Sequence, residues 1–254
     1  MTYIDIGANL TSNKFANLDD IIKYSFDNNI YSIIITGTNS STSQQALDIV
    51  NKFESYNLFS TVGIHPRNAK SYNEKQYELL KKLLQNDKVV AIGECGLDYN
   101  RNTSSKEKQL LAFEKQIRLA VEFNKPLFLH ERDATVDFIK TINEYKKVVR
   151  GVVHCYTGNK ETVKTYLEMG LYIGLTGILC DETQNSELIE AVKCIPLEKI
   201  MVETDCPHFG PSGESINTPK NIKYVVEKIA EIKNIGKDEL SKILLQNTKH
   251  FFGI

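Results

Sequence analysis

The residues of this sequence that could do chemistry stand at the ends of short apolar runs. Four runs of strand length, rich in β-branched residues, lead to an acid or a histidine: Glu94, His130, His154 and Asp205. The carboxyl ends of the strands in a parallel barrel share one face, where active sites are built, so we expect these side chains to converge. Two imidazoles with two carboxylates form a ligand set of a divalent-metal hydrolase.

Each residue also has a plainer interpretation when it is taken alone. Either histidine could be a core residue bonded to a neighbour, and Glu94 could be a surface acid at a strand end. Together they favour a metal site, because a carboxylate buried after an apolar run is costly unless it is paired or metal-bound. Asp205 fits a metal ligand or a general base that takes a proton from metal-bound water. Glu203, two residues earlier, should share the inward face one layer deeper and orient the site.

Three further residues are candidates for contact with substrate. His65 ends the third strand-like run, and Arg132 and His208 lie two and three residues past expected site residues. Arg132 and His208 have two equally good interpretations. They could contact a phosphate or a base of the substrate, or they could be solvated loop residues. The loop 210–215, which follows the last strand, is also expected to contact substrate. His250, in the final helical segment, is expected to be structural.

Alternating strand and helix patterns predict the architecture. Eight strand-like runs at a spacing of about 30 residues, with helical patterns between them, favour a closed (β/α)8 TIM barrel of the metallo-dependent hydrolase type. The runs are 3–6, 32–36, 59–64, 89–93, 126–130, 151–154, 171–175 and 200–203. We expect one domain over residues 1–254. The alternative, a doubly wound open sheet, would be favoured by a Gly-rich phosphate loop after the first strand, and residues 7–10 do not form one.

Local signals predict where some helices begin. Ser104 and Glu107 have the S-x-x-E spacing of a capping box. Thr218 before Pro219 indicates a cap followed by proline at the first helical position. A further helix, from about residue 238 to residue 251, follows the eighth unit and should close the barrel from outside.

Composition excludes several classes of protein. The 254 residues include 31 basic and 32 acidic side chains, so any binding of nucleic acid must come from a local patch. No apolar run approaches the roughly 20 residues of a membrane span, and the first residues read as a strand rather than as a signal peptide. We expect a cytoplasmic monomer with no membrane partner.

The cysteines suit a reducing compartment, because they are five in number and form no C-x-x-C pair. Cys95, Cys155 and Cys206 each directly follow an expected site residue. Alternation along a strand then predicts that these thiols face the helical layer and pack there rather than bind metal.

Several longer motifs resemble the TatD family of metal-dependent deoxyribonucleases over nearly the whole chain. They are Ile4–Thr11, Ile35–Asn39, Gly63–Pro66, Ala91–Asp98, His130–Ala134, His154–Gly158 and Glu203–Pro207. The resemblance implies a TIM barrel with Glu94, His130 and His154 as ligands and Asp205 as the catalytic acid residue and a further candidate ligand. It also implies Mg²⁺ and cleavage of single-stranded DNA, with RNA as a second candidate, from the 3′ end in DNA repair or degradation. Two imidazoles, in contrast, suit Zn²⁺ or Mn²⁺ better than Mg²⁺.

The first strand departs from the pattern of many family members. They carry Asp-x-His-x-His there, whereas the matching positions here hold Asp5, Gly7 and Asn9. Glycine supplies no ligand and the asparagine carbonyl is a weak one, which argues against a two-metal mechanism. The Gly-x-Asn form resembles the TatD subgroup proper, which is regarded as an active nuclease.

Two other functions remain open. One is an amidohydrolase-like reaction on a small ester or amide, because the same barrel and metals serve many chemistries. A rim of Arg or Lys around the site would favour a nucleic-acid substrate instead. The other is a binding module for nucleic acid whose catalytic site has lapsed, which the intact set of four residues argues against.

Overall fold

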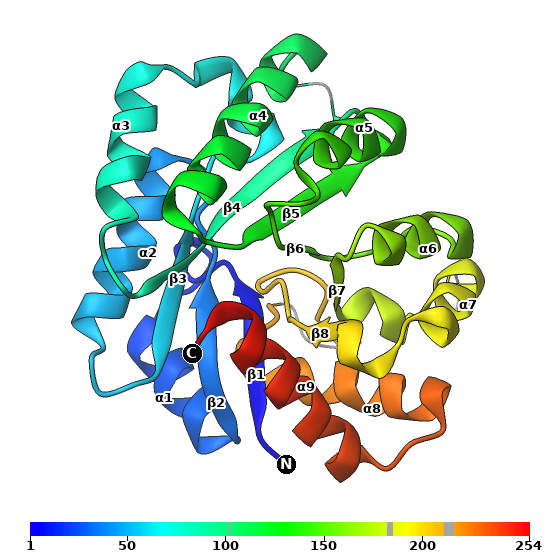
Figure 1. The fold of residues 1–254 in the computed structure, drawn as a ribbon. Helices are drawn as coiled ribbons and strands as arrows, with labels where there is room; N and C mark the ends of the chain where they lie inside the picture. The colour runs from blue at the N-terminus through cyan, green and yellow to red at the C-terminus, as the bar shows by residue number, and fades with distance from the viewer. Residues whose placement is uncertain (102, 182–184, 211–215) are drawn as a thin grey trace.

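Eight parallel strands form the centre of the computed structural model, which describes residues 1–101, 103–181, 185–210 and 216–254. Each strand pairs with the next along the chain, and helices surround them (Figure 1). The strands are β1 Tyr3–Ala8, β2 Ile30–Ile35, β3 Leu58–Val62, β4 Val89–Asp98, β5 Leu127–Arg132, β6 Gly151–Val153, β7 Tyr172–Leu175 and β8 Ile200–Val202. Backbone bonds from Asp205 N to Gly7 O and from Asn9 N to Cys206 O, both 2.9 Å, join the segment after β8 to β1. The predicted TIM barrel is confirmed.

Helices connect successive strands on the outside of this barrel (Figure 1). They are α1 Leu18–Asp27, α2 Ser40–Lys52, α3 Glu74–Leu83, α4 Lys106–Phe123, α5 Thr135–Tyr145, α6 Lys160–Glu168, α7 Ser186–Cys194, α8 Ile222–Lys233 and α9 Lys237–Phe252. Short 3₁₀ turns are η1 Pro66–Ser71, η2 Gly177–Cys180, η3 Leu197–Lys199 and η4 Pro219–Asn221. None of the described helices is both long enough and apolar enough to cross a membrane.

The buried apolar side chains form two clusters. The larger one fills the layer between strands and helices. The smaller one comprises Ile4, Ile6, Ile34, Val90, Ala91, Phe128, Val152, Met201, Phe251 and Phe252. The extra helix, α9, was predicted to cover the barrel from outside. Its last turn also contributes Phe251 and Phe252 to the smaller cluster, where they pack with residues of the strands.

Two capping predictions need correction. Helix α4 is capped by Ser105, whose side chain accepts from Lys108 N at 3.4 Å, and not by Ser104. The Ser104 hydroxyl instead accepts from Lys70 N at 2.9 Å and so holds the preceding loop against η1. Thr218 precedes the short turn η4, and no side-chain capping bond is formed there. Both residues stand at loop–helix junctions, but Ser104 bonds to another segment and the Thr218 hydroxyl forms no hydrogen bond with the described residues.

Two of the three cysteines that follow site residues pack as predicted. Cys95 and Cys206 are fully buried in the layer between strands and helices. Cys155 differs, because its φ of 46° turns the chain just past the end of β6 and breaks the strand alternation. The residue is half-buried, and its sulfur lies 3.7 Å from the Thr176 hydroxyl oxygen. Of the loop expected to contact substrate, residues 211–215 lie outside the described residues.

Strand β4 is longer than predicted, so Glu94 lies within the strand and not at its end. The pairing of β4 with β5 is irregular between Ile92 and Cys95 and then continues to Asp98. Gly96 makes this continuation possible: its φ is 143°, and an added Cβ would overlap the carbonyl oxygen of His130. The glycine thus allows β4 to remain beside β5 beyond the carboxylate.

We predict that Gly96→Ala lowers the free energy of unfolding by about 3 kcal/mol or more, because both the backbone angle and the space exclude a methyl group. Urea denaturation of the purified variant measures this. Gly236→Ala is the control, since a Cβ there meets nothing within 4 Å, and its cost should stay within about 1 kcal/mol, the loss of glycine at the N-cap of α9. Equal effects at the two positions would contradict the prediction.

Candidate active site

A single carboxylate oxygen is the centre of the candidate site. Oε1 of Glu94 lies 2.8 Å from Nδ1 of His130, 2.8 Å from Nε2 of His154 and 3.3 Å from Nε2 of His65. The histidines come from β5, from just past β6 and from the segment between β3 and η1. The structure thus brings together three of the residues expected to converge. It also buries His65, the expected substrate contact, inside this cluster.

The charges in the cluster act on one another strongly. Burial raises the pKa of Glu94, but His154, His65 and His130 more than offset this and hold it well below its ordinary value. Burial lowers the pKa of His154, but the carboxylates of Glu94 and Glu203 hold it well above its usual range. The Glu94 carboxylate is therefore ionised at neutral pH, which is the form that binds a cation.

Two groups of side chains in the described part of the chain have the geometry to hold a metal ion. They are Glu94 with His130 and His154, and His65 with Asp98 and His130, and in each the ligand atoms lie within 4.8 Å of one another. Nε2 of His130 is 3.5 Å from Oδ2 of Asp98, while its Nδ1 faces Glu94. The two groups found among the described residues therefore share the His130 imidazole but approach it through opposite ring nitrogens.

Asp98 is a residue of this site that the sequence analysis missed. It ends the run Gly93–Asp98 and lies four residues after Glu94 on the same strand. Side chains an even number of positions apart share one face of a strand, which is the signal that could have found it. The prediction that the strand ended at residue 93 concealed this relation.

Two buried glutamines of α4 hold the segments that carry His65 and Asp98. Gln116 accepts from Ile64 N at 2.7 Å and donates to Ile64 O at 3.1 Å. Gln109 accepts from Asp98 N at 2.8 Å and donates to Asp98 O at 2.9 Å. Each amide satisfies both main-chain groups of one residue, so the positions of these two segments relative to α4 are fixed.

Glu203 contacts the cluster through the His154 ring. It is fully buried, its Oε2 lies 3.3 Å from Nδ1 of His154, and its Oε1 accepts from Cys155 N at 2.5 Å. Gly7 and Gly174 make room for this carboxylate: a Cβ on Gly7 would overlap Oε2, and one on Gly174 would lie 2.7 Å from Oε1. The space beside Gly7 therefore holds the side chain of Glu203.

Asp205 is in neither of the two metal-binding groups of the described residues. Its Oδ1 accepts from Nδ2 of Asn9 at 2.8 Å, and its φ of 48° places the backbone in the left-handed region. Burial raises the pKa of Asp205 to about 7; His154 opposes this rise and Glu94 adds to it. Asn9, at the position of a histidine in many family members, thus holds the Asp205 carboxylate in place.

Asp5 is engaged by groups outside the metal-binding clusters. Its carboxylate accepts from Gly7 N at 3.2 Å, from Thr204 N at 3.0 Å and from the Thr204 hydroxyl at 2.5 Å. Burial raises the pKa of Asp5 to about 7 despite these bonds. The side chain therefore ties β1 to the segment after β8.

Arg132 and His208, the other two residues expected to contact substrate, lie at the carboxyl end of the barrel, which we call the rim. Arg132 is exposed at the end of β5 and His208 is exposed after β8, and neither has a described contact with Glu94. Partial burial lowers the pKa of His208, and three cations lower it further: Lys14, Arg67 and Arg101. These cations lie in the segments after β1, β3 and β4, so three positive charges act on His208 at this end of the barrel although the whole chain is nearly neutral.

A parallel eight-stranded barrel with a buried cluster of histidines and carboxylates at the carboxyl ends of its strands is the architecture of the metal-dependent hydrolases. Within this class, the chain belongs to the family described as TatD related DNase, which matches residues 4–253. The family is metal-dependent, in keeping with the two candidate metal-binding groups.

Individual relatives match along almost their entire length. The protein named 3'-5' ssDNA/RNA exonuclease TatD from Escherichia coli K12 is 38% identical over 258 residues, which cover 98% of each chain. Its namesake from Shigella flexneri is equally similar. A solved TatD family hydrolase from Entamoeba histolytica shares 30% identity with a TM-score of 0.91 and covers 99% of this chain and 98% of its own.

We predict that Gly7→Ala lowers the free energy of unfolding by about 2 kcal/mol, because the methyl group displaces the Glu203 carboxylate. In a Glu203→Ala background that carboxylate is gone, so the same change should cost at least about 1 kcal/mol less. Urea denaturation of the four proteins of this double-mutant cycle measures the difference. An equal cost in both backgrounds would show that Gly7 is required for another reason.

Proposed function

We propose that this protein is a metal-dependent exonuclease that hydrolyses single-stranded DNA, with RNA as a second substrate, from the 3′ end. The names of relatives at 38% identity over 98% of both chains support this substrate and polarity. The four residues expected from the sequence to do the chemistry are all present, and three of them meet at one oxygen atom.

The combination of the Glu94 cluster with the cationic rim is the observation that carries this proposal. A phosphodiester chain is an anion along its whole length, and Lys14, Arg67 and Arg101 act on His208 at the carboxyl end of the barrel, where the chain would arrive. A small neutral ester or amide would gain little from such a rim. The same observation therefore favours a nucleic acid over the amidohydrolase-like alternative.

We assign the primary metal ligands to Glu94, His130 and His154, whose donor atoms already lie within 4.8 Å of one another. An ionised carboxylate with two imidazoles suits Zn²⁺ or Mn²⁺, whereas the family resemblance favours Mg²⁺. A divalent cation bound there would polarise the scissile phosphate and favour ionisation of the attacking water. Glu203 orients the His154 ring by its contact with Nδ1.

We assign proton transfer to Asp205. The Asn9 amide holds its carboxylate through Oδ1, and the backbone of Asp205 is bonded to Gly7 O across the closing seam of the barrel. A carboxylate fixed in this way can orient the attacking water and accept its proton. His208 and Arg132, exposed at the rim, are assigned to contacts with the substrate phosphates or bases.

We further propose that residues 1–254 act as one domain and as a monomer in the cytoplasm, in DNA repair or degradation. All five cysteines are free thiols, which suits a reducing compartment. Sedimentation equilibrium of the purified protein tests the monomer.

Labelled single- and double-stranded oligonucleotides, incubated with Mg²⁺, Mn²⁺ or Zn²⁺, test the function. We predict that a chelator abolishes cleavage, and that Asp205→Asn lowers turnover by about a hundredfold or more while metal binding is largely kept. His154→Ala should instead lose the metal. If Asp205→Asn lost the metal as completely as His154→Ala, Asp205 would be a primary ligand. Tight binding of the oligonucleotide without cleavage in any metal would favour the lapsed binding module.

We also predict that the free protein binds one divalent ion tightly and takes a second only when nucleic acid is present. The two candidate groups share His130, and Asp5 is engaged with Thr204, so a second ion would depend on water and substrate phosphates. Calorimetric titration with and without a non-cleavable oligonucleotide measures this. Two tight sites in the free protein would contradict it.

A further inference from the structure

An exposed aromatic side chain lies beside the candidate site without an assigned role. Phe209 follows Asp205 by four residues, and 42% of its surface is exposed. Its φ of 53° is unfavourable for a bulky residue, so this backbone conformation must be imposed by its surroundings. A strained backbone that presents a large apolar ring to solvent is typical of a binding position.

The segment that carries Phe209 is held from several sides. Asn217 Nδ2 donates to Thr204 O at 3.0 Å and to His208 O at 2.7 Å, and His208 N bonds to Asp205 O at 3.0 Å. A Cβ on Gly177 would overlap the Phe209 carbonyl oxygen, so η2 lies directly against this backbone. These contacts fix the main chain between Asp205, the proposed proton acceptor, and the ring.

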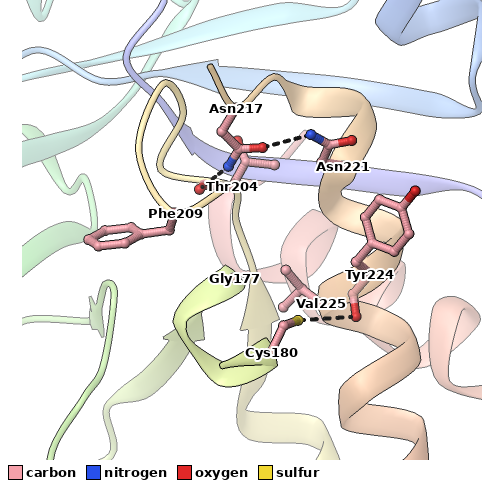
Figure 2. Close-up of a pocket in the computed structure, with 8 residues that line it drawn as sticks. All are labelled: Gly177, Cys180, Thr204, Phe209, Asn217, Asn221, Tyr224 and Val225. Carbon is pink, nitrogen blue, oxygen red and sulfur yellow. Dashed lines mark hydrogen bonds between the residues drawn. The ribbon is translucent and has the colours of Figure 1, made fainter. Parts of the chain in front are cut away.

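The ring is not part of the nearby apolar pocket. The pocket lies between η2 and α8, and its far wall includes Cys180, Tyr224 and Val225. Figure 2 shows that the Phe209 ring points away from these residues, although the backbone of Phe209 borders the same pocket. The ring is therefore available to a ligand at the rim.

The neighbours of Phe209 indicate what kind of ligand would bind to its ring. Its ring centroid is 6.1 Å from that of His208, and His208 is the residue on which the rim cations Lys14, Arg67 and Arg101 act. The Glu94 carboxylate raises the pKa of the same His208. The Glu94 cluster, the three cations and the Phe209 ring therefore belong to one region. Proteins bind single-stranded nucleic acid with cations that attract the phosphates and with aromatic rings on which the bases stack.

We infer that Phe209, with His208 beside it, forms a stacking platform for the nucleobase next to the scissile phosphate. This inference rests on the proposed nuclease function and names the part of the substrate that the rim recognises. Stacking tolerates any base, because every base has a π-face, and it needs an unpaired base. Such a platform would favour single strands without selecting for sequence.

Fluorescence of a 3′-terminal 2-aminopurine in a single-stranded oligonucleotide tests the platform without turnover. In the Asp205→Asn background with Mg²⁺, we expect binding to quench this base. Phe209→Ala should abolish the quenching and Phe209→Tyr should retain it. Tyr224→Ala is the matched control, because Tyr224 is a similarly exposed aromatic, at 40%, on the opposite wall of the same pocket.

Kinetics with the active enzyme give a second readout. Phe209→Ala should raise KM for the oligonucleotide about tenfold or more, in the range measured for loss of one stacked base, with a smaller change in kcat. An oligonucleotide with an abasic 3′ end should be cleaved equally by both proteins. Circular dichroism checks folding, and Phe209→Leu, which keeps the apolar volume, replaces the alanine variant if the latter does not fold.

The outcomes separate this inference from the proposed function. If the wild-type protein cleaves no oligonucleotide with any metal, the proposed function is wrong. If it cleaves them, but Phe209→Ala leaves both the quenching and KM unchanged, the platform is overturned and the function stands. Equal quenching at a terminal and an internal 2-aminopurine would also overturn the platform.

Discussion

The burial of an ionised carboxylate among three imidazoles is the constraint on which the rest of the structure depends. Glu94 can stay charged in a closed environment only because His65, His130 and His154 surround one of its oxygens. These partners come from three other segments of the barrel, so the cluster requires that their ends be placed accurately. A cation would replace contacts that the side chains already make with one another.

Small residues and buried amides supply that accuracy. Gly96 lets β4 run beside β5 past the carboxylate, and Gly7 leaves space for the Glu203 carboxylate under His154. At Gly96 the missing side chain leaves room for the His130 backbone, and at Gly7 it leaves room for a functional side chain. The positions of the site residues therefore depend on these glycines, and replacing a glycine is expected to displace the site residues.

Much of this arrangement could be predicted from the sequence, because barrel strands place their last residues on one face. What could not be predicted depends on contacts between distant segments. Asp98 was missed because the strand was predicted to end at residue 93, whereas β4 continues beside β5 past Glu94. Gly7 looked like a lost ligand, since its role depends on Glu203, which lies far away in the chain. Ser104 has the spacing of a cap, but its hydroxyl bonds to η1 instead.

The paired hydrogen bonds of Gln109 and Gln116 have a consequence for how such a barrel can change during evolution. Both amides bond to main-chain atoms, so they hold their partner segments whichever side chains those segments carry. The residues at the mouth can be exchanged while the framework beneath them keeps its shape. Placement and chemistry are thus encoded separately, which allows one scaffold to acquire new reactions without having to be rebuilt.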